Sequence, residues 1–68
     1  MANTKEKLGR RIQKLRKALG YTQEELAEKL NISRTHMGHH IEQGKKSPSL
    51  KLMEKIAKAL KINLSELF

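Results

Sequence analysis

The sequence contains no cysteine, so neither a disulfide nor a thiolate metal site can stabilise its fold. No apolar run approaches membrane-spanning length, and the N-terminal sequence MANTKEKLGRR lacks the apolar core of a signal peptide. No stretch alternates between apolar and polar residues as a β-strand does. We therefore expect a soluble, cytoplasmic, all-α protein whose small core depends on close helix packing or on a second subunit.

The sequence also lacks the residue patterns of an enzyme. It has no credible pair of nucleophile and base and no glycine-rich phosphate loop. His36 and His40 have the i, i+4 spacing that can place two imidazoles on one ion, and His39 lies beside them. Without a nearby carboxylate or thiolate they are a thin ligand set, so we predict no metal and no other cofactor.

Acidic residues are scarce, with seven Asp and Glu against 15 Lys and Arg, which gives a formal charge of +8. Residues 1–20 carry seven basic and one acidic residue, and residues 44–68 carry six basic and two acidic. Residues 21–43 between them carry two basic and four acidic. This excess favours a polyanionic partner, nucleic acid before membrane, with basic flanks that hold phosphates and a centre that inspects bases.

Apolar residues recur with helical period through most of the chain, and capping residues divide them into helices. Asn3 with Glu6 predicts the start of a first helix, and Gly20 predicts its end. Thr22 with Glu25 is a capping box that opens a second helix. The expected buried faces are Leu8, Ile12, Leu15 and Leu19 in the first helix and Leu26, Ala27 and Leu30 in the second.

Asn31 can adopt the left-handed conformation that ends the second helix, and Ile32 then anchors a tight turn. Ser33 caps a third helix that buries Met37 and Ile41 and ends at Gly44. After a short loop, Ser49 caps a fourth helix, and Asn63 with Glu66 precedes a last helical turn. The fourth helix is expected to bury Leu50, Met53, Ile56, Ala57 and Leu60. We predict a single domain over residues 1–68, a compact five-helix bundle.

The segments LGRRIQKLRKALGYTQEELAEKLNISRT and IEQGKKSPSLKLMEKIAKALKINLSELF resemble the phage repressor/Cro-type helix-turn-helix domain. The resemblance covers Leu8 to Phe68, and TQEELAEKL, IEQG and PSL together make it specific. It implies that helices two and three form the helix-turn-helix, with the third in the major groove of double-stranded DNA. The implied function is a small bacterial or phage transcriptional regulator of repressor type, which binds a palindromic operator as a homodimer.

The resemblance also assigns residues to the DNA interface. It makes Arg34 and Thr35 the principal readers of base edges, with His36 and His39 as further candidates. An arginine in this place can donate two hydrogen bonds to guanine, worth about 1–3 kcal/mol of discrimination. A solvent-exposed residue at a helix start is the alternative for Arg34.

Other matched positions imply phosphate contacts and one structural contact. Gln23 corresponds to a residue that grips a phosphate at the start of helix two, where free N–H groups also point at the anion. Lys45 and Lys46 follow helix three, where relatives touch the DNA backbone, although they can equally serve solubility. Arg16 and Glu42 correspond to a pair that ties helix one to the end of helix three.

The third helix departs from the family pattern because THMGHH holds one residue more than relatives typically have, either His39 or His40. An insertion in an α-helix rotates everything beyond it by about 100°. Met37 and Ile41 still share a face at a spacing of four. We expect either a single-turn π-bulge, which we favour, or early fraying at Gly38.

The C-terminal segment carries more apolar surface than one small core needs, which makes it a candidate dimer surface; closure of the monomer core is the alternative. A different function also fits this fold, namely a protein-interaction module such as an antitoxin or an adaptor. No small-molecule ligand is evident. The candidate dimer surface comprises Leu60, Ile62, Leu64, Leu67 and Phe68.

Overall fold

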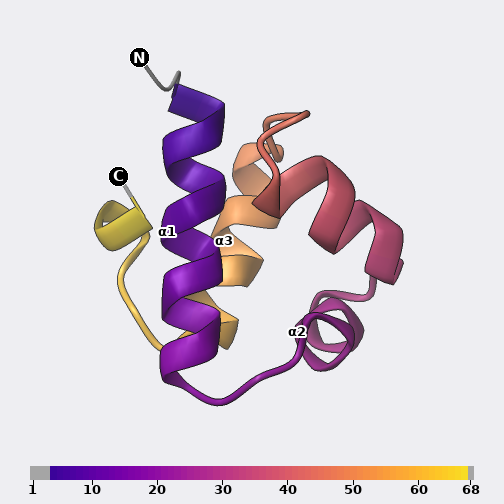
Figure 1. Cartoon of the computed structure of the whole chain (residues 1–68). Coiled ribbons are helices and arrows are strands. Elements are labelled where there is room, and N and C mark those ends of the chain that lie inside the picture. The colour runs from indigo at the N-terminus through magenta and orange to yellow at the C-terminus, as the bar shows by residue number, and fades with distance from the viewer. Residues whose placement is uncertain (1–3, 68) are drawn as a thin grey trace.

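The structure, a computed structural model, describes residues 4–67, and every regular element in that range is helical (Figure 1). This confirms the all-α prediction. The helix count is smaller than expected, because four helices are followed by a single four-residue 3₁₀ turn in place of a fifth helix. The elements are α1 (Thr4–Ala18), α2 (Gln23–Leu30), the π-helix η1 (His36–Glu42), α3 (Leu50–Ala59) and the 3₁₀ turn η2 (Leu64–Leu67).

The ends of the helices follow the predicted capping residues. The Thr22 hydroxyl accepts from the Glu25 N–H and the Glu25 carboxylate accepts from the Thr22 N–H, so the capping box is complete. Asn31 adopts φ 58° and ψ 44°, the left-handed conformation expected at the end of α2. The Ser49 hydroxyl accepts from Leu52 N–H at the start of α3. The predicted cap at Asn3 lies outside the described residues.

The last helical segment is a single turn because Asn63 and Glu66 at its two ends are hydrogen-bonded to each other. The Glu66 carboxylate accepts from the Asn63 N–H at 2.7 Å, and the Glu66 N–H donates to the Asn63 carbonyl at 2.9 Å. Arg11 of α1 donates from Nε to the Glu66 carbonyl at 3.0 Å. These bonds hold η2 against α1 as one tight turn.

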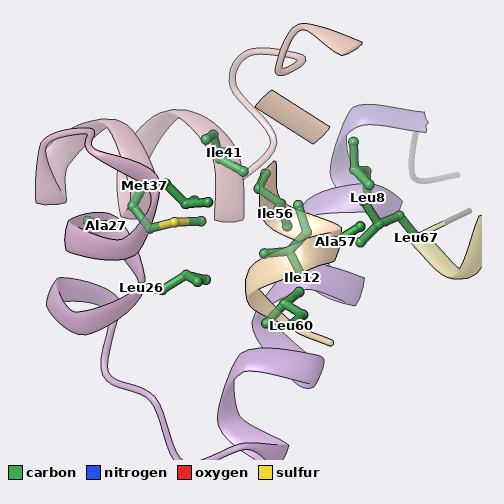
Figure 2. Close-up of a cluster of buried hydrophobic side chains, with 11 residues drawn as sticks. Leu8, Ile12, Leu26, Ala27, Met37, Ile41, Ile56, Ala57, Leu60 and Leu67 are labelled. Atoms are coloured by element: carbon green, nitrogen blue, oxygen red, sulfur yellow. The ribbon is translucent and has the colours of Figure 1, made fainter. Parts of the chain in front are cut away.

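The hydrophobic core lies where α1, α2, η1 and α3 meet, and η2 closes one side of it (Figure 2). Ile12 of α1 is completely buried among side chains from the other helices. Two residues of the predicted dimer surface, Leu60 and Leu67, are only 2% and 1% exposed. They belong to the monomer core, so that part of the dimer prediction is wrong. The buried apolar residues are Leu8, Ile12, Leu26, Ala27, Leu30, Met37, Ile41, Ile56, Ala57, Leu60 and Leu67.

Two leucines predicted to be buried lie on the surface. Leu19 is 43% exposed because α1 ends at Ala18 and Leu19 belongs to the following turn. Leu50 is 62% exposed because it lies six positions before the fully buried Ile56. At about 100° per residue, this spacing turns Leu50 about 120° away from the core. Leu52, only about 40° from Ile56 on the same helix, packs against the core instead.

The backbones of α1 and η1 touch at Gly9. A Cβ atom on Gly9 would lie 2.5 Å from the Ile41 carbonyl oxygen and 2.6 Å from that of Glu42. Glycine is therefore required at this position, because both neighbours are backbone atoms of a packed helix. This contact sets the position of η1 relative to α1. Within residues 4–67 no helix is both long enough and apolar enough to cross a membrane.

Candidate nucleic-acid interface

The third helix begins as an α-helical turn and continues as a π-helix. The Ser33 hydroxyl accepts from His36 N–H at 3.0 Å and its carbonyl accepts from Met37 N–H at 3.0 Å, so Ser33 is the expected cap. From His36 to Glu42 the helix is π, and the N–H of Gln43 reaches back to the Gly38 carbonyl. The extra residue is thus absorbed by a π-helix, as predicted, over seven residues and not a single turn. The alternative of early fraying is wrong, because Gly38 is buried inside the helix.

Burial along this helix repeats every four residues. Met37 and Ile41 enter the core, whereas Thr35, His39 and Gln43 are exposed. Residues four apart share a side in an α-helix and in the wider π-helical turn alike. His39 therefore lies on the same side of the helix as Thr35.

The exposed side of this helix borders a polar hollow, which we call the reading face. Arg34 and Thr35 are exposed at the beginning of the helix. Within the described part of the chain, the Arg34 side chain has no hydrogen bond or ion pair, so its donors face solvent. Hydroxyl, guanidinium, amide and imidazole groups thus converge on one open surface. The reading face is lined by Gln23, Arg34, Thr35, Gly38, His39 and Gln43.

Gln23, the first residue of α2, lies directly over Gly38. A Cβ on Gly38 would stand 2.9 Å from the Gln23 Oε1, so glycine makes room for this side chain. The Gln23 Nε2 donates to the Glu42 Oε1 at 3.2 Å. Gly38 is therefore a close-approach position between α2 and η1, and Gln23 is held at the edge of the reading face.

Arg16 and Glu42 form a buried, two-bonded ion pair between α1 and η1. The Arg16 Nε is 2.8 Å from the Glu42 Oε2 and its Nη2 is 3.2 Å from Oε1. The Arg16 Nη1 also donates to the Tyr21 carbonyl at 2.6 Å, which ties down the turn before α2. The side chains are 7% and 2% exposed. Through Glu42, this pair connects α1 to Gln23 and so to the reading face.

The three histidines lie close together but differ in exposure. His39 is exposed, whereas His36 and His40 are half-buried, and the His40 ring lies 5.4 Å from His36 and 5.3 Å from His39 between centroids. The covered Nδ1 of His40 has no hydrogen-bond partner in the described structure. Among residues 4–67 no group of three or more His, Cys, Asp or Glu side chains is placed to hold a metal ion.

The two lysines after η1 are exposed, and the Lys46 N–H donates to the His40 carbonyl at 2.8 Å. This bond fixes the loop against the end of the helix while leaving the side chains of Lys45 and Lys46 in solvent. Gln43 also lines the reading face, and the sequence analysis does not predict it. Its spacing of four from His39 is the signal that would have identified it.

His40 should make folding sensitive to mild acid. Burial lowers the pKa of its imidazole below the usual 6.5, and Lys46, His36 and His39 lower it further. The folded chain then binds fewer protons than the unfolded chain below pH 6.5, so the free energy of unfolding should fall as the pH drops from 6.5 through the folded-state pKa. Urea midpoints measured between about pH 5 and pH 8 test this.

His40→Gln should flatten this dependence, whereas His39→Gln, at the exposed neighbour, should leave most of the His40 contribution in place because burial is the largest cause of the lowered pKa. An unchanged pH profile in His40→Gln would show that the lowered pKa of His40 is not its source.

Two short helices crossed at a fixed angle, with a polar open face on the second, define a protein of the helix-turn-helix class. The chain belongs to the helix-turn-helix domain family, whose sequence profile matches residues 7–67.

This chain is similar to several known proteins, among them the following three. The immunity repressor protein of Bacillus phage phi105 is 43% identical over 58 residues, which cover 85% of this chain and 40% of the repressor. The controller protein C.AhdI of the Aeromonas hydrophila restriction-modification system is 40% identical with a TM-score of 0.87, covering 93% of this chain and 94% of that one. SinR of Bacillus subtilis, the master regulator of biofilm formation, was solved in complex with DNA. It is 33% identical with a TM-score of 0.81, over 88% of this chain and 95% of the SinR chain.

These similarities confirm the family resemblance, and the relatives are regulators rather than enzymes. The chain is a DNA-binding transcriptional regulator of the helix-turn-helix type. It spans less than half of the phage repressor's length.

Proposed function

We propose that the reading face enters the major groove of double-stranded DNA and recognises a specific sequence. The observation that carries this proposal is the exposure of Arg34 and Thr35 at the beginning of a helix held rigidly by core contacts. Arg34 can donate to guanine N7 and O6, and Thr35 can present its methyl group to thymine or its hydroxyl to a base or phosphate. His39, on the same side of the helix as Thr35, and the half-buried His36 are the further base-reading candidates.

The phosphate contacts lie on both sides of this face. Gln23 occupies the start of α2, where unpaired backbone N–H groups favour an anion, and its side chain is positioned by Glu42. Lys45 and Lys46 extend from the other end of η1 and supply charge that is independent of sequence. These contacts position the protein, and the reading face between them selects the bases.

The protein acts as a homodimer of repressor type on a palindromic operator, with half-sites about 34 Å apart. A domain of this size makes few base contacts alone, so pairing supplies affinity and specificity. Of the candidate dimer surface, Ile62 and Leu64 are half-buried in the single chain and can still contribute to a dimer contact. Phe68 lies outside the described residues. A bacterial or phage-encoded protein of this kind works in the cytoplasm, where its DNA is.

A protein-interaction module on the same fold would behave differently towards salt. A groove binder with six or more phosphate contacts should lose about 1,000-fold or more in affinity between about 50 and 200 mM salt, with a log-linear dependence. A module that docks on proteins would show no saturable binding to any duplex in this range. Fluorescence anisotropy with labelled duplexes separates the two functions.

Arg34→Ala and Lys45→Ala should affect DNA binding in different ways: the first should change base preference, and the second should change affinity for every sequence. Removing Arg34 should cost about 1–3 kcal/mol on the preferred sequence and relax the preference at one base pair. Removing Lys45 should weaken binding to all sequences about equally and reduce the salt slope by about one. Affinities for the preferred duplex and its single-base variants measure both effects. An unchanged base preference in Arg34→Ala would remove Arg34 from the reading role.

A further inference from the structure

A second basic surface lies away from the reading face, in a groove between the end of α2 and one side of α3. Its two adjoining parts share Leu30, Asn31 and Lys55. No residue lines both this groove and the reading face. Gln23 begins α2 and Leu30 ends it, so the two surfaces lie at opposite ends of this helix, about 10 Å apart along its axis. We call this surface the lysine groove, after Lys29, Lys51, Lys55, Lys58 and Lys61.

The lysines of α3 form a row. Lys51, Lys55 and Lys58 are spaced at i, i+4 and i+7 and therefore share one side of the helix, and Lys61 follows just past its end. The row is about 15 Å long. All five lysines of the groove are exposed, and within residues 4–67 none of them forms an ion pair.

Helix stability explains only part of this row. Lys29 and Lys58 lie in the last turns of their helices, where the helix dipole favours a positive charge. Lys51 lies instead in the first turn of α3, where the dipole disfavours it. Lys61 has a φ of 60°, a left-handed conformation that glycine or asparagine adopts with less strain. Helix stability therefore does not explain the positions of Lys51 and Lys61.

The floor of the groove is weakly apolar. Leu30, which is buried, and Ala59, which is half-buried, supply its apolar atoms. The ring of Tyr21 also lines the groove, and the Lys29 Nζ lies 5.1 Å from its centroid. Ammonium groups are compact point charges without the planar donor pattern that reads base edges. A row of such charges fits a linear polyanion whose charges repeat at regular intervals.

We propose that the lysine groove binds the phosphate backbone of a second DNA segment, separate from the segment in the reading face. The two surfaces share no lining residue and border opposite ends of α2, so a DNA segment can contact one without using any residue of the other. One domain would then hold two duplexes together. This inference goes beyond sequence-specific binding and depends on charge, not on any base contact.

The test is an NMR titration of the ¹⁵N-labelled protein with a short mixed-sequence DNA duplex at low salt. The amide signals of Arg34, Thr35 and Gln43 should shift first, and those of residues 29–31 and 51–61 should shift in a second, weaker phase. With about four phosphate contacts, the affinity of the second phase should fall about 100-fold between about 50 and 200 mM salt. Groove signals that never shift, or that shift together with the reading face at one duplex per chain, would overturn the inference.

Two variants of equal charge test whether the second binding phase depends on the lysine groove. The groove variant should lose the second phase, whereas the control variant should keep it. The first phase should remain in both variants and weaken about equally, because each loses the same charge. Each has four exposed lysines fewer than the wild type, so the formal charge falls by four from +8. The groove variant is Lys51→Gln, Lys55→Gln, Lys58→Gln and Lys61→Gln; the control is Lys5→Gln, Lys7→Gln, Lys14→Gln and Lys17→Gln.

Three outcomes are decisive against the inference: the groove variant keeps the second phase, the control loses it equally, or polyglutamate shifts the groove signals at lower concentration than DNA. The last would assign the groove to an acidic protein segment. Absence of the first phase alone would count against the reading face and not against the lysine groove, so the two proposals fail separately.

Discussion

Replacing Arg16 with methionine is expected to lower the free energy of unfolding by about 3–5 kcal/mol. The substitution strands the Glu42 carboxylate, whose side chain is 2% exposed, without its ionic partner. It also removes the donor to the Tyr21 carbonyl. A chain of 68 residues is stable by about 3–10 kcal/mol in total, at 0.05–0.15 kcal/mol per residue, so the expected loss is a large share of the total stability. Urea denaturation followed by far-ultraviolet circular dichroism measures the loss.

The double replacement Arg16→Met with Glu42→Leu separates a stranded charge from lost packing. Apolar substitution of both partners of a buried ion pair is often neutral. We therefore expect the double variant to recover most of the stability, although Gln23 then lacks its acceptor on Glu42. A double variant no more stable than Arg16→Met would contradict this account of the pair. DNA affinity of the double variant reports whether Gln23 needs Glu42 to hold its place.

Replacing Gly9 with alanine is expected to cost about 3 kcal/mol, the upper end of the usual penalty for overpacking. The added methyl group would meet the carbonyl oxygens of Ile41 and Glu42, and only a shift of η1 away from α1 relieves the contact. Because that shift also strains the Arg16–Glu42 pair, the packing and ionic losses are coupled. Urea denaturation provides the measurement.

Gly38→Ala is the matched control. The three atoms nearest to its methyl group would all belong to the side chain of Gln23, which can move. We expect a smaller loss of stability and a weaker phosphate contact, seen as reduced affinity for all DNA sequences. Wild-type stability in Gly9→Ala would show that α1 and η1 pack less tightly than the structure describes.

The local features of the fold could be predicted from the sequence because they depend on residues three or four positions apart. The capping box at Thr22, the left-handed Asn31 and the Ser33 and Ser49 caps all involve such contacts. The π-helix could also be predicted from the sequence. A helix that must keep one side against the core can accommodate one extra residue in only a few ways, and a π-helical turn is one of them. From these features the sequence predicts that Arg34 and Thr35 are exposed at the start of the third helix, as the structure shows.

The features that could not be predicted depend on contacts between distant segments. Gly9 is required because η1 crosses α1 there, and Gly38 because Gln23 lies over it; neither partner is near in the sequence. The sequence alone favours fraying at Gly38, because the Gln23 side chain that packs against it comes from a different helix. Leu50 was misplaced because helical period alone does not define which side of α3 the other helices cover. Leu67 lies in the core instead of a dimer surface because η2 folds back on α1. The burial of Leu60 at the end of α3, in contrast, agrees with the helical period of that segment.

The most direct test of the central claim is selection of bound sequences from a random pool of DNA duplexes by the purified protein. If the reading face recognises bases as a dimer, one motif should be enriched, with two inverted half-sites separated by about one helical turn, ~34 Å. Repeating the selection with Arg34→Ala should blur one base pair in each half-site. Recovery of no motif from the pool, while the protein is folded and binds DNA, would contradict the claim.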